Sequence, residues 1–490
     1  AFLAWKQTRF SFDLYSELSS RLFSIYLSQP YTFHLQRNSA LLIRNVRAEV
    51  AMFAQSVVTP VMNIIAETLV LFGICILLLI VEPLGMLIVM AVLGIATGGF
   101  YYITKGYVVR WGQARQYHDR WSLQHLTQGL GGIKDLKILG REAEFLKEFD
   151  THTSQGAKMN QSQTTLQQMP RLWLELLGVI ALVVMVLNML NQGKEISTIA
   201  PTLGLFAAAA FRLMPSVNRI ISAVQQLRYS YPAVHTLYEE LSLPPENREN
   251  NGITSLKNKI EIKDISYSYP DSSELSLNKI GLNVTKGESI GIIGPSGSGK
   301  STLVDILLGL LVPTDGKIKL DGQDILSNLR SWQDQVGYVP QSIYLTDDTL
   351  RRNIAFGLSE SQIDNVAIHK AIKAAQLEDF VTDLPEGIET MVGEHGVRLS
   401  GGQRQRIGIA RALYHDPSVL VLDEATSALD VTTEKEVMKA ITALQGNKTI
   451  FIVAHRLSTV ENCDFLYKLE QGKVVAEGAP EDVLSVKQES

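Results

Sequence analysis

Cysteine is nearly absent from the 490 residues, and an excess of either charge sign is absent too. Cys75 lies in an apolar run and Cys463 in a polar segment, so neither a disulfide nor a cysteine-based metal site is expected. Lys and Arg number 45 against 50 Asp and Glu, for a net charge of -5. Nothing in this balance points to nucleic acid, and no nucleic-acid partner is expected.

The first residues, "AFLAWKQTRFSFDLYSEL", lack a Met and lack the basic and apolar regions of a secretory leader. We expect that the sequence begins partway through a longer protein.

Long apolar runs are plentiful in the first half of the chain. A helix needs about 20 apolar residues to cross a bilayer. Four stretches satisfy this length, at about 60–81, 84–103, 172–190 and 196–221. The sequence therefore predicts an all-α transmembrane domain with four spans.

The basic residues set the orientation of these spans. Most Lys and Arg of the loops lie between the second and third spans, which places this long segment and both chain ends in the cytoplasm. Its recurring apolar positions and few turn residues predict cytoplasmic helices that extend the spans and reverse near Gly129–Gly132. The alternative is that these helices are merely solvated and contact nothing.

The composition changes after Tyr238. The stretch "LSLPPENRENNGITS" is typical of a linker. Beyond it, short β-rich runs alternate with helical stretches, which predicts a parallel sheet covered by helices. We expect a transmembrane domain at 1–238, a linker at 239–258 and an α/β domain at 259–490.

The strongest local motif is "GPSGSGKST", residues 294–302. It follows the apolar run "SIGII" and precedes the helical "LVDILLGLL", as a phosphate-binding loop requires. Its glycines let backbone N–H groups converge on phosphate at a helix N-terminus. Lys300 would reach the β and γ phosphates, and Ser301 would hold Mg²⁺. The expected ATP-binding residues of this loop are Gly294, Ser296, Gly297, Gly299, Lys300, Ser301 and Thr302.

A second apolar strand, "VLVLDEA", ends in two acids. Asp423 would bind Mg²⁺, and Glu424 would act as the general base toward water. Paired acids at this position can instead cap a following helix.

The motif "LSGGQ", which begins at Leu399, completes a pattern that resembles the ATP-binding cassette (ABC) transporters of the exporter type. Further matches along the chain are "YSYP", "VPQ", "GEHG", "SALD" and "VAHRLST". The resemblance implies a membrane domain fused to an ABC ATPase with a helical subdomain, and ATP and Mg²⁺ as cofactors. It implies that Tyr269 stacks on adenine, that Gln341 binds Mg²⁺ and takes part in catalysis, and that His455 takes part in catalysis. It also implies that ATP is bound by Asp430 and by the signature residues Ser400, Gly401, Gly402 and Gln403.

The resemblance also implies a second half-transporter. In this family the signature of one cassette closes on the ATP of the other, and a homodimer is the simplest assembly, with a heterodimer as the alternative. "QPYTFHLQ" and "GGIKDLKILGREAEFLKEF" resemble the coupling loops of such exporters. The family usually has six spans per half, whereas this sequence has four.

Three arginines lie in or beside the last two spans. Arg171 and Arg219 could snorkel to the interface, and Arg212 could pair with Glu175 or Glu67. Guanidinium groups also suit phosphate, so we expect them to meet an anionic lipid-linked substrate.

The stretches "FRLMPSVNRI" and "MPRLWLELLG" are similar to the bacterial flippases of lipid-linked oligosaccharides. This resemblance implies a polyprenyl-pyrophosphate substrate and a location in the bacterial inner membrane with the ATPase domain in the cytoplasm. Another lipid, a peptide or an amphiphilic drug is the alternative cargo, and an ATP-gated channel is an alternative class.

Overall fold

The computed structural model describes residues 2–81, 83–191, 196–245, 255–270, 272, 274–393, 396, 399–424, 431–454 and 456–485. The chain forms two compact units, Ala1–Glu246 and Asn247–Ser490. Their boundary falls within the segment 239–258 expected to be a linker. Each unit is described by itself below.

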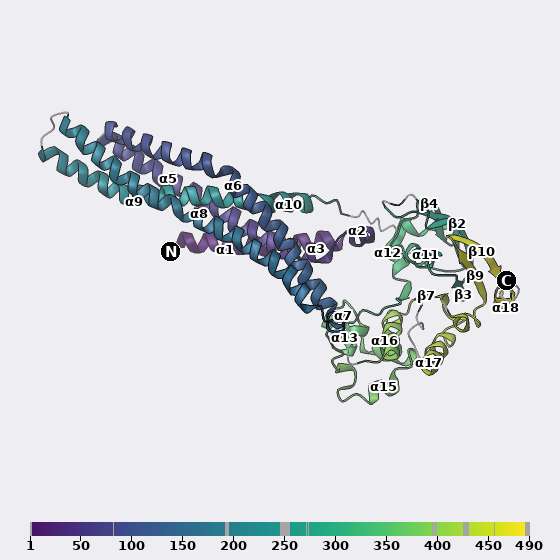
Figure 1. The fold of residues 1–490 in the computed structure, drawn as a ribbon. Helices are drawn as coiled ribbons and strands as arrows, with labels where there is room; N and C mark the ends of the chain where they lie inside the picture. The colour runs from purple at the N-terminus through teal and green to yellow at the C-terminus, as the bar shows by residue number, and fades with distance from the viewer. Residues whose placement is uncertain are drawn as a thin grey trace. The chain divides into compact units, whose positions relative to one another are not determined.

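The described part of the first unit consists of helices (Figure 1). They are α1 (Phe2–Leu27), α2 (Tyr31–Gln36), α3 (Ser39–Arg44), α4 (Val50–Phe53), α5 (Thr59–Val81), α6 (Pro83–Gly131), α7 (Ile133–Leu139), α8 (Glu142–Asn191), α9 (Ile196–Tyr229) and α10 (Tyr231–Leu241).

Four helices of the described chain are long and apolar enough to cross a membrane, and they lie in α5, α6, α8 and α9. Figure 1 shows these four helices running alongside one another. Leu78, Met86, Met185 and Phe206 are buried where they meet. Each of the four predicted spans falls within one of these helices.

The helical extensions of the spans are also confirmed. Helices α6 and α8 contain 49 and 50 residues, far more than the roughly 20 that a bilayer requires. The reversal between them takes two breaks, not one. Gly132 separates α6 from α7, and Gly140, with a φ of 62°, ends α7 in the left-handed conformation that glycine tolerates best.

The N-terminal helices pack on α6 through a buried charge cluster that the sequence did not predict. The Arg44 Nε atom lies 3.6 Å from Glu49 Oε1, and Arg115 Nη2 of α6 lies 3.8 Å from Glu49 Oε2. All three side chains are buried. Glu49 ends a π-helical turn, Asn45–Glu49, which interrupts the regular helix.

The second unit contains two sheets. A six-stranded sheet has the order β10-β9-β3-β8-β7-β6, parallel except for β10, and a four-stranded antiparallel sheet has the order β2-β1-β4-β5. The strands are β1 (Lys259–Tyr267), β2 (Leu277–Thr285), β3 (Ser289–Ile293), β4 (Asp315–Leu320), β5 (Gln323–Asp324), β6 (Val336–Val339), β7 (Val419–Asp423), β8 (Thr449–Val453), β9 (Phe465–Glu470) and β10 (Lys473–Gly478).

Helices pack on these sheets. They are α11 (Lys300–Leu307), α12 (Leu329–Gln333), α13 (Leu350–Ile354), α14 (Asn365–Ala374), α15 (Glu378–Thr382), α16 (Gly401–Leu413), α17 (Val431–Thr442) and α18 (Pro480–Ser485). Strands β3, β7 and β8 are buried at every residue, because they lie in the middle of the parallel sheet. The predicted fold class, a transmembrane helix bundle followed by an α/β domain, is confirmed.

Candidate functional site

The predicted phosphate-binding loop connects β3 to α11. Gly299, the residue before α11, has a φ of 99°, which other residues rarely adopt. A Cβ atom at this position would lie 2.6 Å from Leu277 Cδ2 and 2.7 Å from the Ser276 carbonyl oxygen. Only glycine therefore lets the loop pass this close to β2 while the N–H groups of α11 stay open toward a ligand.

Lys300 is fixed inside the loop. Its Nζ atom donates hydrogen bonds to the carbonyl oxygens of Gly294 and Pro295, each at 2.9 Å, and the residue is 5% exposed. Burial lowers the pKa of Lys300, while the carboxylates of Glu424 and Asp423 act in the opposite direction. The ammonium group is thus held by neutral acceptors that a phosphate oxygen can replace.

A cavity of about 650 Å³ opens over this loop. Six of the predicted loop residues and Glu424 line it, whereas Gly294 and Tyr269 do not. The Tyr269 hydroxyl lies 3.1 Å from Thr302 Oγ1 and its ring packs on Tyr267. The residues that line the cavity are Ser272, Glu274, Leu275, Ser276, Ser296, Gly297, Gly299, Lys300, Ser301, Thr302, Glu424, Gln471 and Gly472.

Sequence reasoning missed the part of this lining that comes from outside the loop. Residues 272 and 274–276 precede β2, and residues 471 and 472 form the turn between β9 and β10. Neither segment carries a motif. The backbone carbonyl of Gly472 accepts from the Asn278 N–H at 2.8 Å, and this bond ties the turn to β2.

The two predicted acids lie at the end of β7. Asp423 is 8% exposed, and Glu424 follows it with a φ of 50°, an uncommon conformation for a residue with a side chain. Gln341 Nε2 donates a hydrogen bond to Glu424 Oε2 at 2.7 Å. Burial, together with the nearby charge of Asp423, raises the pKa of Asp305 on α11 to about 6. The structure thus brings the glutamine and the acids together beside the loop.

The signature residues open helix α16. Ser400 Oγ accepts from the Gln403 N–H at 3.2 Å, and Gln403 Oε1 accepts from the Ser400 N–H at 2.8 Å. This capping box fixes the helix start and leaves the next N–H groups open. None of residues 400–403 lines the cavity over the loop. Two predicted site residues, Asp430 and His455, lie outside the described residues.

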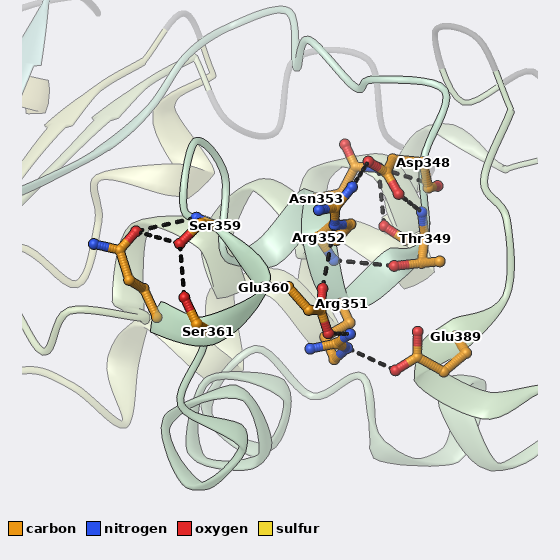
Figure 2. A network of polar contacts seen from close by, with 10 residues as sticks. Asp348, Thr349, Arg351, Arg352, Asn353, Ser359, Glu360, Ser361 and Glu389 are labelled. Atoms are coloured by element: carbon orange, nitrogen blue, oxygen red, sulfur yellow. Dashed lines mark hydrogen bonds and ion pairs between the residues drawn. The ribbon is translucent and has the colours of Figure 1, made fainter.

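A network of polar contacts surrounds α13, in the segment that follows Gln341 (Figure 2). Buried Asn353 donates through Nδ2 to the carbonyl oxygen of Thr346 at 3.0 Å and accepts through Oδ1 from the Thr346 N–H at 2.9 Å. Arg351 of α13 pairs with Glu360 and donates to Glu389 Oε1 at 2.6 Å. This network fixes α13 to the two short helical turns that carry these glutamates.

Arg411 connects the signature helix to the same segment. It donates from Nε to the Asn353 carbonyl oxygen and from Nη1 to the Tyr344 carbonyl oxygen, each at 2.8 Å. Its guanidinium also lies over the Phe356 ring, 4.7 Å from the centroid. Burial lowers the pKa of Arg411 to about 10. Sequence patterns gave no sign of this connection.

The first unit contains a second cavity of about 610 Å³, between α8 and α9. Arg171 and Arg219 line it, and most of its other lining residues are apolar. Arg212 is exposed on α9 and is not among them. The residues that line the cavity are Arg171, Leu174, Glu175, Gly178, Val179, Leu182, Ala207, Ala210, Phe211, Met214, Pro215, Asn218 and Arg219.

Both arginines of this cavity have acidic partners. Arg171 Nε donates to Glu175 Oε1 at 2.9 Å, one helical turn away. Arg219 pairs with Glu67 of α5, which also accepts from Ser216 Oγ at 2.6 Å. The two acids considered as partners of Arg212 are therefore bound to the other two arginines.

The residues around the first cavity fit ATP with Mg²⁺. Glycines at positions where a Cβ atom would collide leave a cradle of N–H groups at the start of α11. The buried ammonium group of Lys300 suits phosphate. The Ser301 hydroxyl and the carboxylates of Asp423 and Glu424 offer the oxygen ligands that Mg²⁺ prefers.

Comparisons with known proteins agree with this geometry. Residues 8–211 match the family model "ABC transporter transmembrane region", and residues 277–427 match "ABC transporter". The chain is 31% identical over 476 residues to the "ATP-dependent lipid A-core flippase" of Cupriavidus metallidurans, covering 96% of this chain and 79% of that protein. The chain belongs to the ABC transporters.

Two further proteins are also similar to this chain. The protein of the same name from Alkalilimnicola ehrlichii is 35% identical over 365 residues, which cover 74% of this chain and 62% of that protein. A solved structure, "Structure of a bacterial Atm1-family ABC exporter with ATP bound", superposes with a TM-score of 0.86 at 24% identity, over 98% of this chain and 85% of that one. This likeness shows the exporter fold.

The chain is therefore an ABC exporter half-transporter, a membrane domain fused to an ABC ATPase. ATP with Mg²⁺ as cofactors, ATP hydrolysis coupled to transport, and a second half-transporter as partner follow from the family. The relatives are bacterial, and together with the four membrane helices they place the protein in the inner membrane with the cassette in the cytoplasm.

Proposed function

We propose that the protein is an ATP-driven flippase that works as a homodimer and moves a lipid with a phosphorylated head group across the membrane. The cavity between α8 and α9 carries this proposal. Its apolar lining suits acyl or prenyl chains, and Arg171 and Arg219 offer guanidinium groups to phosphate. The acids beside these arginines balance their charge until an anionic lipid competes for them.

Two lipids share this chemistry. The names of the relatives favour a lipid A-core glycolipid. The short resemblance around residues 169–178 and 211–220 favours a polyprenyl-pyrophosphate oligosaccharide. Relatives aligned over most of the chain outweigh short stretches, so the lipid A type is the first candidate.

In the cassette, we assign each side chain its role from the family resemblance together with its place. Lys300 would exchange its carbonyl partners for phosphate oxygens, and Tyr269 would offer its ring to adenine. Ser301, Asp423 and Gln341 would hold Mg²⁺, which would supply positive charge against the phosphates. Glu424, oriented by Gln341 Nε2, accepts the proton of the attacking water. Asp430 and His455 complete this assignment on the resemblance alone.

The dimer proposal rests on the position of the signature. Residues 400–403 are absent from the lining of the ATP cavity in the described chain, so a second cassette supplies them to this site. A mixed dimer tests this arrangement. One copy carries Lys300→Ala and the other Ser400→Arg, and each variant alone should be inactive.

If sites form between chains, the mixed dimer contains one site with an intact loop and an intact signature, and ATPase activity partly returns. If each site forms within one chain, the mixture has no intact site and stays inactive, which would contradict the proposal.

The substrate proposal is tested by ATPase rates in lipid nanodiscs. The rates are compared with no addition, with lipid A-core glycolipid and with polyprenyl-pyrophosphate oligosaccharide. A Glu424→Gln variant controls for contaminating ATPases. Stimulation by the first lipid supports the lipid A class, and stimulation by the second alone selects the other candidate. No stimulation by either would reject a phosphorylated lipid while leaving the ATPase in place.

The role of the cavity is tested by variants that keep its charge balance. Arg219→Ala leaves Glu67 unpaired, so it is combined with Glu67→Gln and compared with Glu67→Gln alone. We expect Glu67→Gln/Arg219→Ala and, by the same logic, Arg171→Ala/Glu175→Gln to lose most lipid stimulation while the basal rate stays. Arg212→Ala is the matched control on α9. If only Arg212→Ala abolishes stimulation, the lipid binds elsewhere on α9 and the cavity is not its site.

A further inference from the structure

Three histidines and a glutamate meet where α6 and α8 lie side by side outside the apolar stretches. His118 and His125 lie on α6, seven residues or about two turns apart. Glu148 and His152 lie on α8 and are separated by four residues, which puts both on one helix face. None of these side chains has a role in the nucleotide site or in the lipid cavity.

The side chains are close enough to share one ion. His125, Glu148 and His152 each offer a ligand atom, and these atoms all lie within 4.8 Å of one another. Zinc bonds of about 2.0–2.2 Å in a tetrahedral site place ligand atoms about 3.4 Å apart. The remaining gap is about 1–1.5 Å at most, which rotation of the exposed Glu148 side chain and of the imidazoles can close. No other such group occurs in the described residues.

Neighbouring rings hold the imidazoles in place. The Trp121 ring stacks on His125 at 5.8 Å and on His152 at 6.0 Å between centroids. His118 Nδ1 lies 2.9 Å from His152 Nδ1, so one of them donates a hydrogen bond to the other. When His152 donates, its Nε2 keeps the lone pair for a cation. A second hydrogen bond of this kind orients many metal-binding histidines.

We propose that His125, Glu148 and His152 bind a divalent transition-metal cation of the zinc class that links α6 to α8, with His118 as the partner that orients His152. Two imidazoles and one carboxylate suit zinc and its neighbours in the transition series, whereas Ca²⁺ and Mg²⁺ prefer sites made of oxygen alone. A solvent molecule completes the coordination. The alternative is that the rings only stack and Glu148 remains solvated.

Zinc titration distinguishes a metal site from a stack of rings that binds no metal. The protein is prepared without a polyhistidine tag, placed in nanodiscs and stripped of metal. The buffer contains no nucleotide and an excess of Mg²⁺. Zn²⁺ is then partitioned against a chromophoric chelator. We expect one tight site per chain, weakened at least tenfold by His152→Ala, His125→Ala or Glu148→Gln. His118→Ala should weaken it about tenfold, as loss of an orienting partner does.

The matched control is His235→Ala. His235 and Glu239 have the same four-residue spacing, lie 3.4 Å apart and are exposed, yet they have no third ligand among the described residues. This variant should bind zinc as the unchanged protein does. Equal zinc binding by the unchanged protein and by the double variant His125→Ala/His152→Ala would overturn the proposal.

A second measurement guards against misfolded variants. Glu148→Gln changes an exposed side chain and preserves its size, so it should fold normally. Zinc should slow amide hydrogen exchange in residues 118–125 and 148–156 of the unchanged protein and leave it unaltered in Glu148→Gln. Slowed exchange in both proteins would show that the zinc effect comes from another site, and it would reject the bridge.

Discussion

The ion pair between α5 and α9 allows a quantitative test of charge in the membrane domain. Glu67 is 8% exposed, accepts from Ser216 Oγ at 2.6 Å and pairs with Arg219. Glu67→Ala leaves the Arg219 guanidinium without its counter-charge on an apolar helix. The double variant Glu67→Ala/Arg219→Ala removes both charges.

The magnitude follows from burial. A charge at the middle of a membrane helix costs about 3 kcal/mol on insertion scales. Removal of one partner from a fully buried pair costs about 3–5 kcal/mol. The Arg219 side chain is 57% exposed rather than fully buried within the protein, so the cost is smaller than for a fully buried pair. We expect Glu67→Ala to lower the free energy of unfolding by about 1–2 kcal/mol. The double variant should lose less than the sum of the two single variants.

The assay is unfolding by SDS in mixed micelles, followed by tryptophan fluorescence, for the unchanged protein, both single variants and the double variant. A coupling energy near 1 kcal/mol is expected for Glu67 with Arg219. The control pair is Glu67 with Arg228, whose guanidinium lies on the Tyr101 ring, and it should be additive. Additivity of Glu67 and Arg219 within about 0.5 kcal/mol would refute the reasoning.

Three further predictions concern packing and burial. Gly112→Ala should destabilise the membrane domain by about 1–3 kcal/mol in the same unfolding assay, because its Cβ would lie 2.2 Å from a backbone oxygen of α9. The control is Gly106→Ala, which should be neutral or stabilising because its Cβ would have nothing within 4 Å. Cys463 is 6% exposed, and burial together with Asp464 raises its pKa to about 12. In a variant that lacks Cys75, maleimide should therefore label Cys463 only on unfolding. Arg411→Ala should lower the stability of the cassette by about 1–3 kcal/mol, because it removes the hydrogen bonds that this partly buried guanidinium donates, and Arg411→Lys should lose less. Scanning calorimetry measures both losses as a lower melting temperature. A native Cys463 that reacts readily, or an unchanged melting temperature, would contradict these assignments.

The features that the sequence predicted well are those determined by contiguous residues. A membrane span requires a long apolar run, and a phosphate-binding loop requires its glycines, Lys300 and the flanking strand and helix next to one another. Such patterns determine local structure without knowledge of the rest of the chain. For the same reason each of the four apolar stretches lies within one long helix, and the predicted loop lies between β3 and α11.

The features that sequence missed depend on how helices rotate against one another. Glu67 and Arg219 are separated by 152 positions, and the sequence suggested Glu67 only as one possible partner of Arg212. The rotation of α9 about its axis decides which arginine meets the carboxylate, and packing of its apolar face sets that rotation. The Glu49 cluster between Arg44 and Arg115 escaped prediction for the same reason.

The contacts inside the cassette connect the surroundings of the phosphate-binding loop to the signature helix α16. Gln341 touches Glu424 beside the phosphate-binding loop, and the segment that follows Gln341 is stiffened by Asn353. Arg411 of the signature helix holds two carbonyl groups of that same segment. The partly buried Arg411 guanidinium thus links α16, which begins with the signature, to the hydrogen-bonded segment that follows Gln341.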